Sequence, residues 1–438
     1  MGLIFTLPFS KQSQMNILLL GSGGREHAIG KALKENSLVE KIFFSPGNAG
    51  TCTLGANINV DYQDYEALRL FIQKNGIELV IIGPEAPLVA GLADQLLGDK
   101  LLPDLKVLGP GRGGAMLEGS KSFAKKFMKK FHIPTADYLE VSKSNLDEGL
   151  KHLDSKKGPY VLKADGLAAG KGVLILEDRI EAKNQLKEML DGKFGAASSK
   201  VVIEEFLDGI EFSVFILTDG DNFILLPEAK DYKRIGEGDL GPNTGGMGSV
   251  SPVPFFDEDL KKQVIEAVIR PTIKGLREEK IPYCGFIFFG LILCGREAKV
   301  IEYNCRMGDP ETQVVIPRLK TDLLGLILGT IEGKLSNVNA QIKEESRLAL
   351  IAASGGYPDN YKKGIEIFGL DQVKPEFLFH AGTEIKDGKI VTSGGRVLAI
   401  SCSGETLQEA MDNCYSEINK ICFDGIYYRK DIGKDLLK

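Results

Sequence analysis

From Met15 to Leu108, short apolar runs alternate with stretches of helical pattern. The apolar runs have the length of strands and occupy residues 16–20, 41–45, 79–82 and 107–108. The helical patterns run to Lys34 and over Tyr65–Lys74 and Pro87–Leu97. Strands that alternate with helices form parallel sheets with helices on both faces. The sequence therefore predicts a doubly wound parallel α/β domain over residues 15–116.

A glycine-rich loop, Gly21–His27, joins the first strand to the first helix. The same order occurs where NAD binds, but those folds carry an acidic residue at the end of the second strand to hold the ribose. Here that place reads Phe43-Phe44-Ser45-Pro46-Gly47 and has no acid. Nicotinamide binding is therefore a weak alternative, although the loop can still bind a phosphate group at the helix N-terminus.

Composition narrows the class of protein. The chain has 438 residues, enough for two to four domains at roughly 100–200 residues each. Its formal net charge is −6 and no basic block stands out, which argues against nucleic-acid binding. No apolar run approaches the ~20 residues of a membrane span. The seven cysteines include no Cys-x-x-Cys pair, so reduced thiols in a cytoplasmic protein are expected rather than a zinc site or disulfides.

Residues 1–14 precede the first strand and are expected to form an extra tail. The apolar stretch Leu3–Phe9 is short and interrupted by Pro8. It has neither a basic segment before it nor a small-residue cleavage site after it, so it does not have the pattern of a signal peptide.

The segment Val161–Gly172 combines a short apolar strand with a glycine-rich loop and two lysines, Lys163 and Lys171. A lysine inside a fold needs an anion, because an unpaired buried ammonium is costly. Small residues let backbone N–H groups approach a ligand closely. The pattern favours a polyphosphate site under a flexible flap, and a hairpin turn with solvated lysines is the alternative.

Two further charged positions fit a nucleotide site. Ser120 is expected to cap a helix that runs to about Lys130, which places Lys121 in a first turn where the helix dipole disfavours a cation. A bound phosphate would explain this lysine, although a solvated lysine is common there. In the strand Val201–Phe206, Glu204 and Glu205 point to opposite sides, so one of them faces the core or a cleft.

A metal site is expected on the strand Lys299–Asn304, which should pair with the apolar run Tyr283–Cys294. Alternation places Glu302 and Asn304 on one face, with Ile301 and Tyr303 on the other. Two oxygen ligands, followed by a polar cluster that extends to residue 311, suit Mg²⁺, which takes one or two protein oxygens plus phosphates and waters. The alternative is an edge strand whose polar face meets water.

Two later regions complete the organisation of the chain. Residues 238–249 form a glycine-rich stretch that we expect to be a long functional loop. After residue 332, short apolar runs and one helical pattern, Leu407–Ile421, predict a small α+β domain.

Together these features resemble the phosphoribosylamine–glycine ligase (glycinamide ribonucleotide synthetase) family of the ATP-grasp superfamily, from Met15 to the C-terminus. A single glycine loop is weak evidence, whereas an ordered series of motifs is specific. The motifs that carry the resemblance are Gly21–His27, Pro46–Gly50, Gly83–Leu88, Leu117–Lys121, Lys163–Gly172, Gly241–Gly248, Ile301–Glu311, His380–Thr383 and Arg429–Gly433.

The resemblance implies an α/β and α+β multidomain protein with an ATP-grasp fold. Its parts would be the N-terminal doubly wound parallel domain (15–116), an ATP-grasp domain (117–331) with a flap subdomain at about 135–206, and a small C-terminal α+β domain (332–438). The implied reaction is a step of de novo purine biosynthesis. ATP phosphorylates glycine, and the amine of 5-phosphoribosylamine attacks the glycyl phosphate to give glycinamide ribonucleotide, ADP and phosphate.

The resemblance also implies roles for individual residues. Glu302 and Asn304 would bind Mg²⁺ or Mn²⁺, while Arg306 and Asp231 would be catalytic. The implied ATP-binding residues are Lys121, Lys163, Gly170, Lys171, Glu204, Glu205, Phe206, Leu207 and Glu211. The implied substrate-binding residues are Gly23, Gly24, Arg25, Glu26, Asn48 and Glu85 on the phosphoribosylamine side, with Asp231, Arg306, Gly308 and Asp309 where glycine meets the transferred phosphate.

An acyl phosphate must be kept from water, so the loop around Gly166–Gly172 is the candidate lid. The expected binding partners are the small molecules glycine, 5-phosphoribosylamine and ATP, and neither nucleic acid nor a membrane is expected. The protein is expected to be a monomer. A biotin-dependent carboxylase of the same superfamily is one alternative, but no Met-Lys-Met carrier sequence is present. A regulator that binds ATP without turnover is the other.

Overall fold

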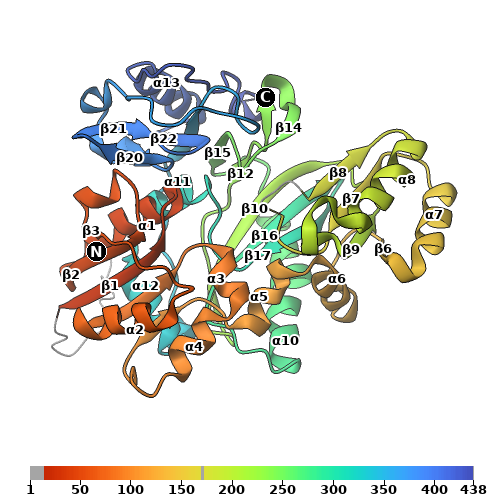
Figure 1. The fold of residues 1–438 in the computed structure, drawn as a ribbon, viewed down its shortest axis with the longest axis horizontal. Coiled ribbons are helices and arrows are strands. Elements are labelled where there is room, and N and C mark those ends of the chain that lie inside the picture. Colours follow the sequence, from red (N-terminus) through yellow and green to blue (C-terminus); the bar gives the residue numbers. More distant parts are fainter. Residues whose placement is uncertain (1–13, 169–171, 438) are drawn as a thin grey trace.

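The computed structural model describes residues 14–168 and 172–437 (Figure 1). Gly170 and Lys171, two of the expected ATP-binding residues, lie outside the described residues, as do residues 1–13 of the expected tail and the centre of the candidate lid. Within the described ranges, no helix has the length and apolar character needed to cross a bilayer.

The N-terminal sheet is fully parallel, as the alternating pattern predicts, with strand order β3-β2-β1-β4-β5. Its strands are β1 (Met15–Gly21), β2 (Val39–Pro46), β3 (Ala56–Asn57), β4 (Ile77–Ile82) and β5 (Lys106–Leu108). Its helices are α1 (Gly24–Lys34), α2 (Tyr65–Lys74), α3 (Glu85–Ala90) and α4 (Leu92–Gly98). The strand order reverses between β1 and β4, so the loops after these strands open a crevice where ligands of such sheets bind.

The single helix expected over Pro87–Leu97 is wrong. Two short helices, α3 and α4, meet at Gly91, whose φ of 86° lies in the left-handed region. Because glycine adopts this conformation without strain and other residues rarely do, the chain turns there instead of continuing as one helix.

Two antiparallel sheets form the middle of the molecule. The central sheet has the order β11-β10-β16-β17, and the flap sheet has the order β6-β9-β7-β8. The central strands are β10 (Ile210–Thr218), β11 (Phe223–Leu225), β16 (Gly285–Cys294) and β17 (Glu297–Asn304); the flap elements are β6 (Tyr138–Ser142), β7 (Tyr160–Ala164), β8 (Val173–Leu176), β9 (Lys200–Glu204), α7 (Leu146–Ser155) and α8 (Arg179–Glu188). The flap sheet and its two helices project from one side of the molecule (Figure 1).

Helices around the central sheet close its hydrophobic core. They are α5 (Arg112–Gly119), α6 (Lys121–Lys130), α9 (Glu258–Val264), α10 (Arg270–Glu278) and α12 (Leu323–Ile331), with a π-helical turn, Ile265–Ile269, between α9 and α10. The short helix α11 (Thr312–Val315) instead packs between α1 and the C-terminal sheet. Ser120 caps α6, since its hydroxyl accepts a hydrogen bond from the Phe123 N–H at 3.1 Å. Phe127 is buried, and Phe123 and Phe131 pack against the same core.

The C-terminal sheet is antiparallel, with strand order β12-β15-β18-β22-β19. Its strands are β12 (Lys230–Asp231), β15 (Gly248–Ser251), β18 (Ser346–Ala353), β19 (Leu378–His380) and β22 (Arg396–Gly404), covered by α13 (Leu407–Ile418) and followed at one end by the hairpin β20 (Thr383–Lys386) and β21 (Lys389–Thr392). Strands β12 and β15 come from the middle of the chain, so the C-terminal sheet is completed by residues that precede it by about a hundred positions.

The prediction of a long loop over residues 238–249 is also wrong. It contains β14 (Leu240–Asn243) and β15, and β14 pairs with β13 (Arg234–Gly236) to form a two-stranded ribbon, which we call the 234–243 ribbon. Glycines gave the segment the composition of a loop, but they belong to the ribbon: Gly238 lies between its two strands and Gly241 lies in β14, both with positive φ.

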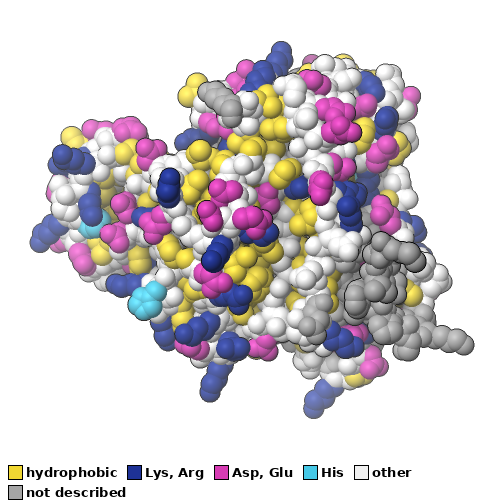
Figure 2. Space-filling view, turned by 180° about the vertical axis from the view of Figure 1, so that it is seen from behind, with side chains coloured by type: hydrophobic (Ala, Val, Ile, Leu, Met, Phe, Trp, Pro, Cys, Tyr) yellow, Lys and Arg dark blue, Asp and Glu magenta, His cyan; other side chains and the backbone are white. Residues whose placement is uncertain are grey.

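Acidic and basic side chains are interspersed on the face of the molecule shown in Figure 2. This mixture of signs is consistent with the absence of a basic block in the sequence.

Candidate active site

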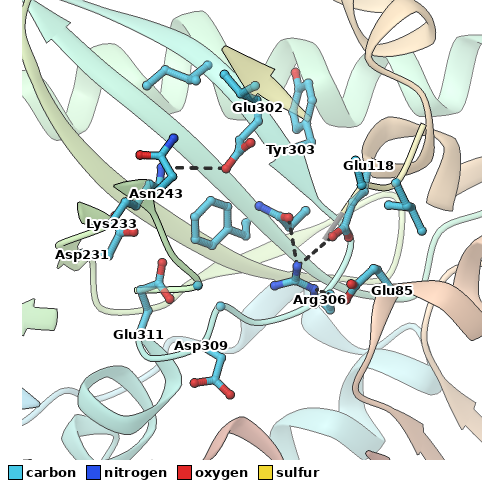
Figure 3. Close-up of a pocket in the computed structure, with 18 of the residues that line it drawn as sticks. Glu85, Glu118, Asp231, Lys233, Asn243, Glu302, Tyr303, Arg306, Asp309 and Glu311 are labelled. Carbon is cyan, nitrogen blue, oxygen red and sulfur yellow. Dashed lines mark hydrogen bonds and ion pairs between the residues drawn. The ribbon is translucent and has the colours of Figure 1, made fainter. Parts of the chain in front are cut away.

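One large cavity of about 1280 Å³ lies where the three parts of the chain meet. It is lined by the loops after β1 and β4, by β17 and the segment that follows it, by the flap, by the 234–243 ribbon, and by Arg396 and Asp435 of the C-terminal part. Figure 3 shows the region around Arg306, where acidic side chains approach one another from several elements.

A buried ion cluster lies at one end of the cavity. Lys163 on β7 is 5% exposed, and its Nζ lies 3.0 Å from Oε2 of Glu204 on β9. The Nζ of Lys125, which the sequence analysis did not single out, lies 3.1 Å from the same oxygen and donates to Oγ1 of Thr135 at 2.8 Å. Glu204 is buried and Glu205 is exposed, as alternation along the strand requires. The Glu204 carboxylate is therefore engaged by two lysines that carry positive charge into the cavity.

Apolar side chains gather at the same end. Ile175 of β8, Phe206 and Ile210 all line the cavity, although they are 43%, 39% and 46% exposed. Leu207 lines it as well. Exposed apolar side chains collected on the wall of a cavity form a slot for a flat apolar ring, and the ion cluster lies beside this slot.

Glu302 lies in the next part of the cavity, facing three lysines. Burial would raise the pKa of this carboxyl, but Lys233, Lys163 and Lys121 outweigh burial and lower it, so Glu302 is ionised. Lys233 lies 3.0 Å from Glu211 and 3.9 Å from Glu302 and so bridges the two carboxylates. Figure 3 shows Lys233 and Glu302. Burial lowers the pKa of Lys121, and Glu302 partly offsets this effect.

The strict alternation expected along β17 is broken at Ile301. The register between β16 and β17 shifts here, because Gly290 pairs with Glu302 whereas Leu291 pairs with Val300. Ile301 is the extra residue of a β-bulge and is only half-buried, whereas Tyr303 is buried in the core. Bulges re-aim neighbouring side chains, and this one leaves Glu302 and Asn304 both at the cavity wall.

Arg306 follows β17 and is held by two carboxylates. Its Nη2 lies 2.9 Å from Oε1 of Glu118 at the end of α5, and its Nε lies 3.3 Å from Oε2 of Glu85. Burial would lower the pKa of the guanidinium, but Glu118 and Glu85 outweigh it and raise that pKa. Arg306 also donates to Oδ1 of Asn304 at 3.2 Å. A fixed, permanently charged guanidinium of this kind suits an anionic substrate group.

Two acidic residues, Asp231 on β12 and Glu311, lie near one another beside Arg306 (Figure 3). Burial, together with the negative charge of the neighbouring Asp231, raises the pKa of Glu311 to about 8. Burial also raises the pKa of Asp231, in spite of Lys233. Gly308 packs closely against Glu311, because an added Cβ would press on the Glu311 carboxylate and force it to move.

Asp309 connects the segment after β17 to the loop after β1. Its Oδ2 accepts a hydrogen bond from the backbone N–H of Arg25 at 3.1 Å, and its Oδ1 accepts one from Gln313 at 3.0 Å. Burial would raise the pKa of Asp309, but the positive charges of Arg396 and Arg25 have the larger combined effect and lower that pKa.

The loop after β1 forms the other end of the cavity. Oε2 of Glu26 accepts from the Gly23 N–H at 2.7 Å, and its Oε1 lies 2.6 Å from Nε of Arg25. Gly23, Arg25, Glu26 and Glu85 line the cavity.

Gly24 and Asn48 are not among the lining residues. The Asn48 amide donates to the carbonyls of Ser22 at 2.8 Å and His380 at 2.9 Å. Within the described residues, Asn48 therefore connects the glycine loop to the C-terminal part of the molecule.

Comparison with known proteins identifies this arrangement. Family models of phosphoribosylglycinamide synthetase match the chain over its N domain (residues 15–118), its ATP-grasp (A) domain (119–312) and its C domain (347–435). The chain belongs to the phosphoribosylglycinamide synthetase family. The resemblance and the ATP-grasp fold expected from the sequence are thereby confirmed.

Individual members of the phosphoribosylglycinamide synthetase family match almost the whole chain. The phosphoribosylamine–glycine ligases of Caldanaerobacter subterraneus subsp. tengcongensis and Clostridium acetobutylicum are each 46% identical to it; the matches cover 96% of this chain and 99% and 100% of those proteins. The crystal structure of the Thermotoga maritima phosphoribosylamine–glycine ligase has a TM-score of 0.83 and 37% identity, covering 95% of this chain and 100% of that one.

A biotin carboxylase domain, from the 2-oxoglutarate carboxylase of Hydrogenobacter thermophilus, shares the fold alone. Its TM-score is 0.72 at 16% identity, and the match covers 95% of this chain and 92% of that one.

Proposed function

We propose that this protein ligates glycine to 5-phosphoribosylamine at the expense of ATP, through a glycyl phosphate intermediate, and so forms glycinamide ribonucleotide, ADP and phosphate. The observation that carries the proposal is the continuity of the cavity. A single space joins the lysines beside the apolar slot, the Arg306 region and the loop after β1, in a chain of this family.

The apolar slot fits the adenine of ATP, and the lysines beside it fit the phosphates. In this assignment Lys163 and Lys121 hold the phosphates, and Glu211 accepts from the ribose. The carboxylate oxygen of glycine then attacks the γ-phosphorus and ADP leaves. Phosphoryl transfer spreads negative charge over the equatorial oxygens, so fixed cations lower its barrier. Arg306, fixed by Glu118 and Glu85, supplies such a charge at the acyl end.

A divalent cation, Mg²⁺ or Mn²⁺, fits the residues at the phosphate end. Glu302 is an ionised carboxylate and Asn304 offers an amide oxygen, both of them hard oxygen donors. Among the described residues no group of three acidic, histidine or cysteine side chains could hold a metal by itself. This donor set suits an ion that completes its coordination with phosphate oxygens and water, and when bound it would neutralise phosphate charge.

The second step takes place at the end of the cavity formed by the N-terminal loop. The amine nitrogen of 5-phosphoribosylamine attacks the carbonyl carbon of glycyl phosphate, the C–O bond to phosphate breaks, and the nitrogen gives up a proton. Glu26 and Glu85 provide acceptors for ribose hydroxyls. Placing both steps in one cavity keeps the acyl phosphate close to its acceptor and away from water.

A substrate-omission experiment tests the proposal. The purified protein is given ATP, Mg²⁺, glycine and 5-phosphoribosylamine, and then each mixture that lacks one component, while ADP and glycinamide ribonucleotide are measured. We expect ADP and product in equal amounts, with product only in the complete mixture. ADP release that needs neither amine nor glycine would contradict the proposal. Release that depends on bicarbonate and biotin would point to a carboxylase, and nucleotide binding without turnover would point to a regulator.

A further inference from the structure

The 234–243 ribbon is a two-stranded element that needs support from elsewhere. Within residues 14–168 and 172–437, strands β13 and β14 pair only with each other, through Arg234 with Asn243 and Gly236 with Leu240. Residues 237–242 are exposed. An isolated two-stranded hairpin is at best marginally stable in water, so a ribbon with a fixed position must be anchored by other residues.

The C-terminal segment 427–435 provides that anchor. Arg429 is 1% exposed, and its Nη1 donates to Oδ1 of Asp239 at 2.7 Å and to the carbonyl of Arg234 at 3.1 Å. Its Nε and Nη2 bind the two oxygens of Asp431 at 2.8 and 2.7 Å. Asp431 in turn accepts from the Gly238 N–H at 2.8 Å. One buried arginine therefore fixes the start of the ribbon directly and its turn both directly and through Asp431.

Two tyrosines add to the same attachment. The hydroxyl of Tyr427 donates to the carbonyl of Ile235 at 2.8 Å. Just before the ribbon, the Tyr232 hydroxyl donates to Asp435 at 2.5 Å, and Asp435 also lies 3.1 Å from the ammonium of Lys230. In Figure 1, β14 lies beside the C-terminal end of the chain.

The anchored ribbon reaches the phosphate end of the cavity. Arg234, Asp239, Asn243 and Thr244 all line the cavity. At the base of the ribbon, the Thr244 N–H donates to the carbonyl of Lys233 at 2.7 Å, and Lys233 bridges Glu211 and Glu302. Figure 3 shows Asn243 beside Lys233 and near the Glu302 carboxylate.

We infer that Arg429 is a positioning residue, which fixes the 234–243 ribbon over the phosphate end of the cavity and thereby holds Lys233 between Glu211 and Glu302. It acts through the ribbon and does not line the cavity itself. The kinetic part of this inference rests on the proposed ligase function, whereas the ribbon's attachment and its effect on nucleotide binding do not.

The chain offers a matched control in Arg347. This arginine is also buried in the C-terminal part, where it donates to Oγ and to the carbonyl of Ser401 at 3.0 and 3.1 Å. It also forms an ion pair with Glu345, just before β18, at 3.2 Å, and among the described residues none of its side-chain hydrogen bonds reaches the 234–243 ribbon. Arg347→Ala should therefore lower thermal stability without changing the ribbon or the affinity for ATP.

The test compares Arg429→Ala, Arg429→Lys and Arg347→Ala with the unchanged protein. Hydrogen–deuterium exchange is measured on peptides from the ribbon and from β18 and β22, ATP affinity by calorimetry, and kcat/KM for ATP and for 5-phosphoribosylamine by the ligase assay. For Arg429→Ala we expect faster exchange in the ribbon but not in β18 or β22, and a loss of about tenfold in ATP affinity and in kcat/KM for ATP. KM for 5-phosphoribosylamine should stay within about twofold. Lysine, which lacks the forked donors, should restore only part of the loss.

Unchanged exchange in the ribbon of Arg429→Ala would overturn the inference, as would an equal loss of ATP affinity in Arg347→Ala. If Arg429→Ala does not fold, Asp431→Asn replaces it, with the same pattern expected at smaller size. Should the unchanged protein lack ligase activity, the proposed function fails, while exchange and ATP affinity still decide the role of Arg429.

Discussion

The guanidinium of Arg306 donates to the carboxylate of Glu118 at 2.9 Å, although the two residues are 188 positions apart. The other oxygen of Glu118 accepts from the backbone N–H of Cys305 at 2.7 Å. Burial raises the pKa of Glu118, and Arg306 opposes this effect. The end of α5 thus fixes both the charge and the backbone of the segment that carries Arg306.

Replacing Glu118 by Gln should therefore impair catalysis more than nucleotide binding. The amide keeps the size of the side chain but loses the charge-assisted hydrogen bond, so Arg306 becomes less well fixed. We expect kcat to fall about tenfold, with ATP affinity within about twofold of the unchanged protein. Glu279→Gln, which alters an exposed ion pair with Lys130, is the control. A normal kcat in Glu118→Gln would show that Arg306 does not need this partner.

Glu302 is the carboxylate expected to bind the divalent cation. Glu302→Gln should raise the Mg²⁺ concentration needed for half-maximal rate and lower the rate, with little change in thermal stability, because a neutral amide is a poorer ligand for a hard cation. Asn304→Ala should have the same effect in milder form. Glu297→Gln, on the same strand but exposed, serves as the control. An unchanged dependence of rate on Mg²⁺ in Glu302→Gln would rule out the metal assignment.

Lys163 and Lys125 both pair with Glu204, but we expect Lys163 to matter for ATP affinity and Lys125 for the stability of the fold. In Lys163→Ala, Glu204 stays paired with Lys125, so the protein should still fold. Its ATP affinity should fall strongly, because an ammonium expected to bind phosphate is lost. Lys125→Met removes a buried ammonium that also binds Thr135 and the Ala136 carbonyl, and should cost about 3 kcal/mol of unfolding free energy. Calorimetry and denaturant unfolding on both variants measure the two effects. Equal ATP affinity in Lys163→Ala and the unchanged protein would exclude a phosphate-binding role.

A pair of buried histidines should make stability depend on pH. The backbone N–H of His380 donates to Nδ1 of His27 at 2.8 Å, which requires that nitrogen to be unprotonated. Burial lowers the pKa of His380 to about 4, with a contribution from Lys31, and lowers the pKa of His27 as well. Because the unfolded chain takes up these protons near pH 6.5 and the folded protein does not, stability is full above pH 6.5 and falls as the pH drops toward 4.

The contribution of His380 to this loss should be about 3 kcal/mol of unfolding free energy. In His380→Gln the fall between pH 6.5 and 4 should be correspondingly smaller, as measured by urea unfolding at several pH values. His132→Asn is the control, since His132 is exposed and asparagine tolerates its positive φ. The same pH dependence in His380→Gln as in the unchanged protein would contradict the assignment.

Much of the fold could be predicted from local sequence patterns. The parallel sheet, the cap at Ser120 and the pairing of β16 with β17 follow from alternation and capping signals within short windows. The errors at Gly91, at Ile301 and in the 234–243 ribbon arise where the backbone departs from regular periodicity. A left-handed glycine, a bulge and turn glycines inside a ribbon are set by packing against distant segments, which a local pattern does not contain.

Part of the candidate site could also be predicted from the sequence, where its residues belong to short motifs. Lys163, Glu302 and Arg306 belong to short motifs, and the structure brings them to one cavity. Glu118 was missed because its partner is remote in the sequence. Lys125 lies in a lysine-rich helix where most lysines are solvated, although its position four residues after Lys121, on the same helix face, was an available signal.

The transfer of a glycine oxygen to phosphate tests the central claim most directly. Glycine labelled with oxygen-18 in its carboxylate is supplied with ATP, Mg²⁺ and 5-phosphoribosylamine, and the released phosphate is examined by mass spectrometry. If glycine attacks the γ-phosphorus and the amine then displaces phosphate, one labelled oxygen must leave with the phosphate and the other must stay in the amide of glycinamide ribonucleotide. Product formed together with unlabelled phosphate would contradict the glycyl phosphate route.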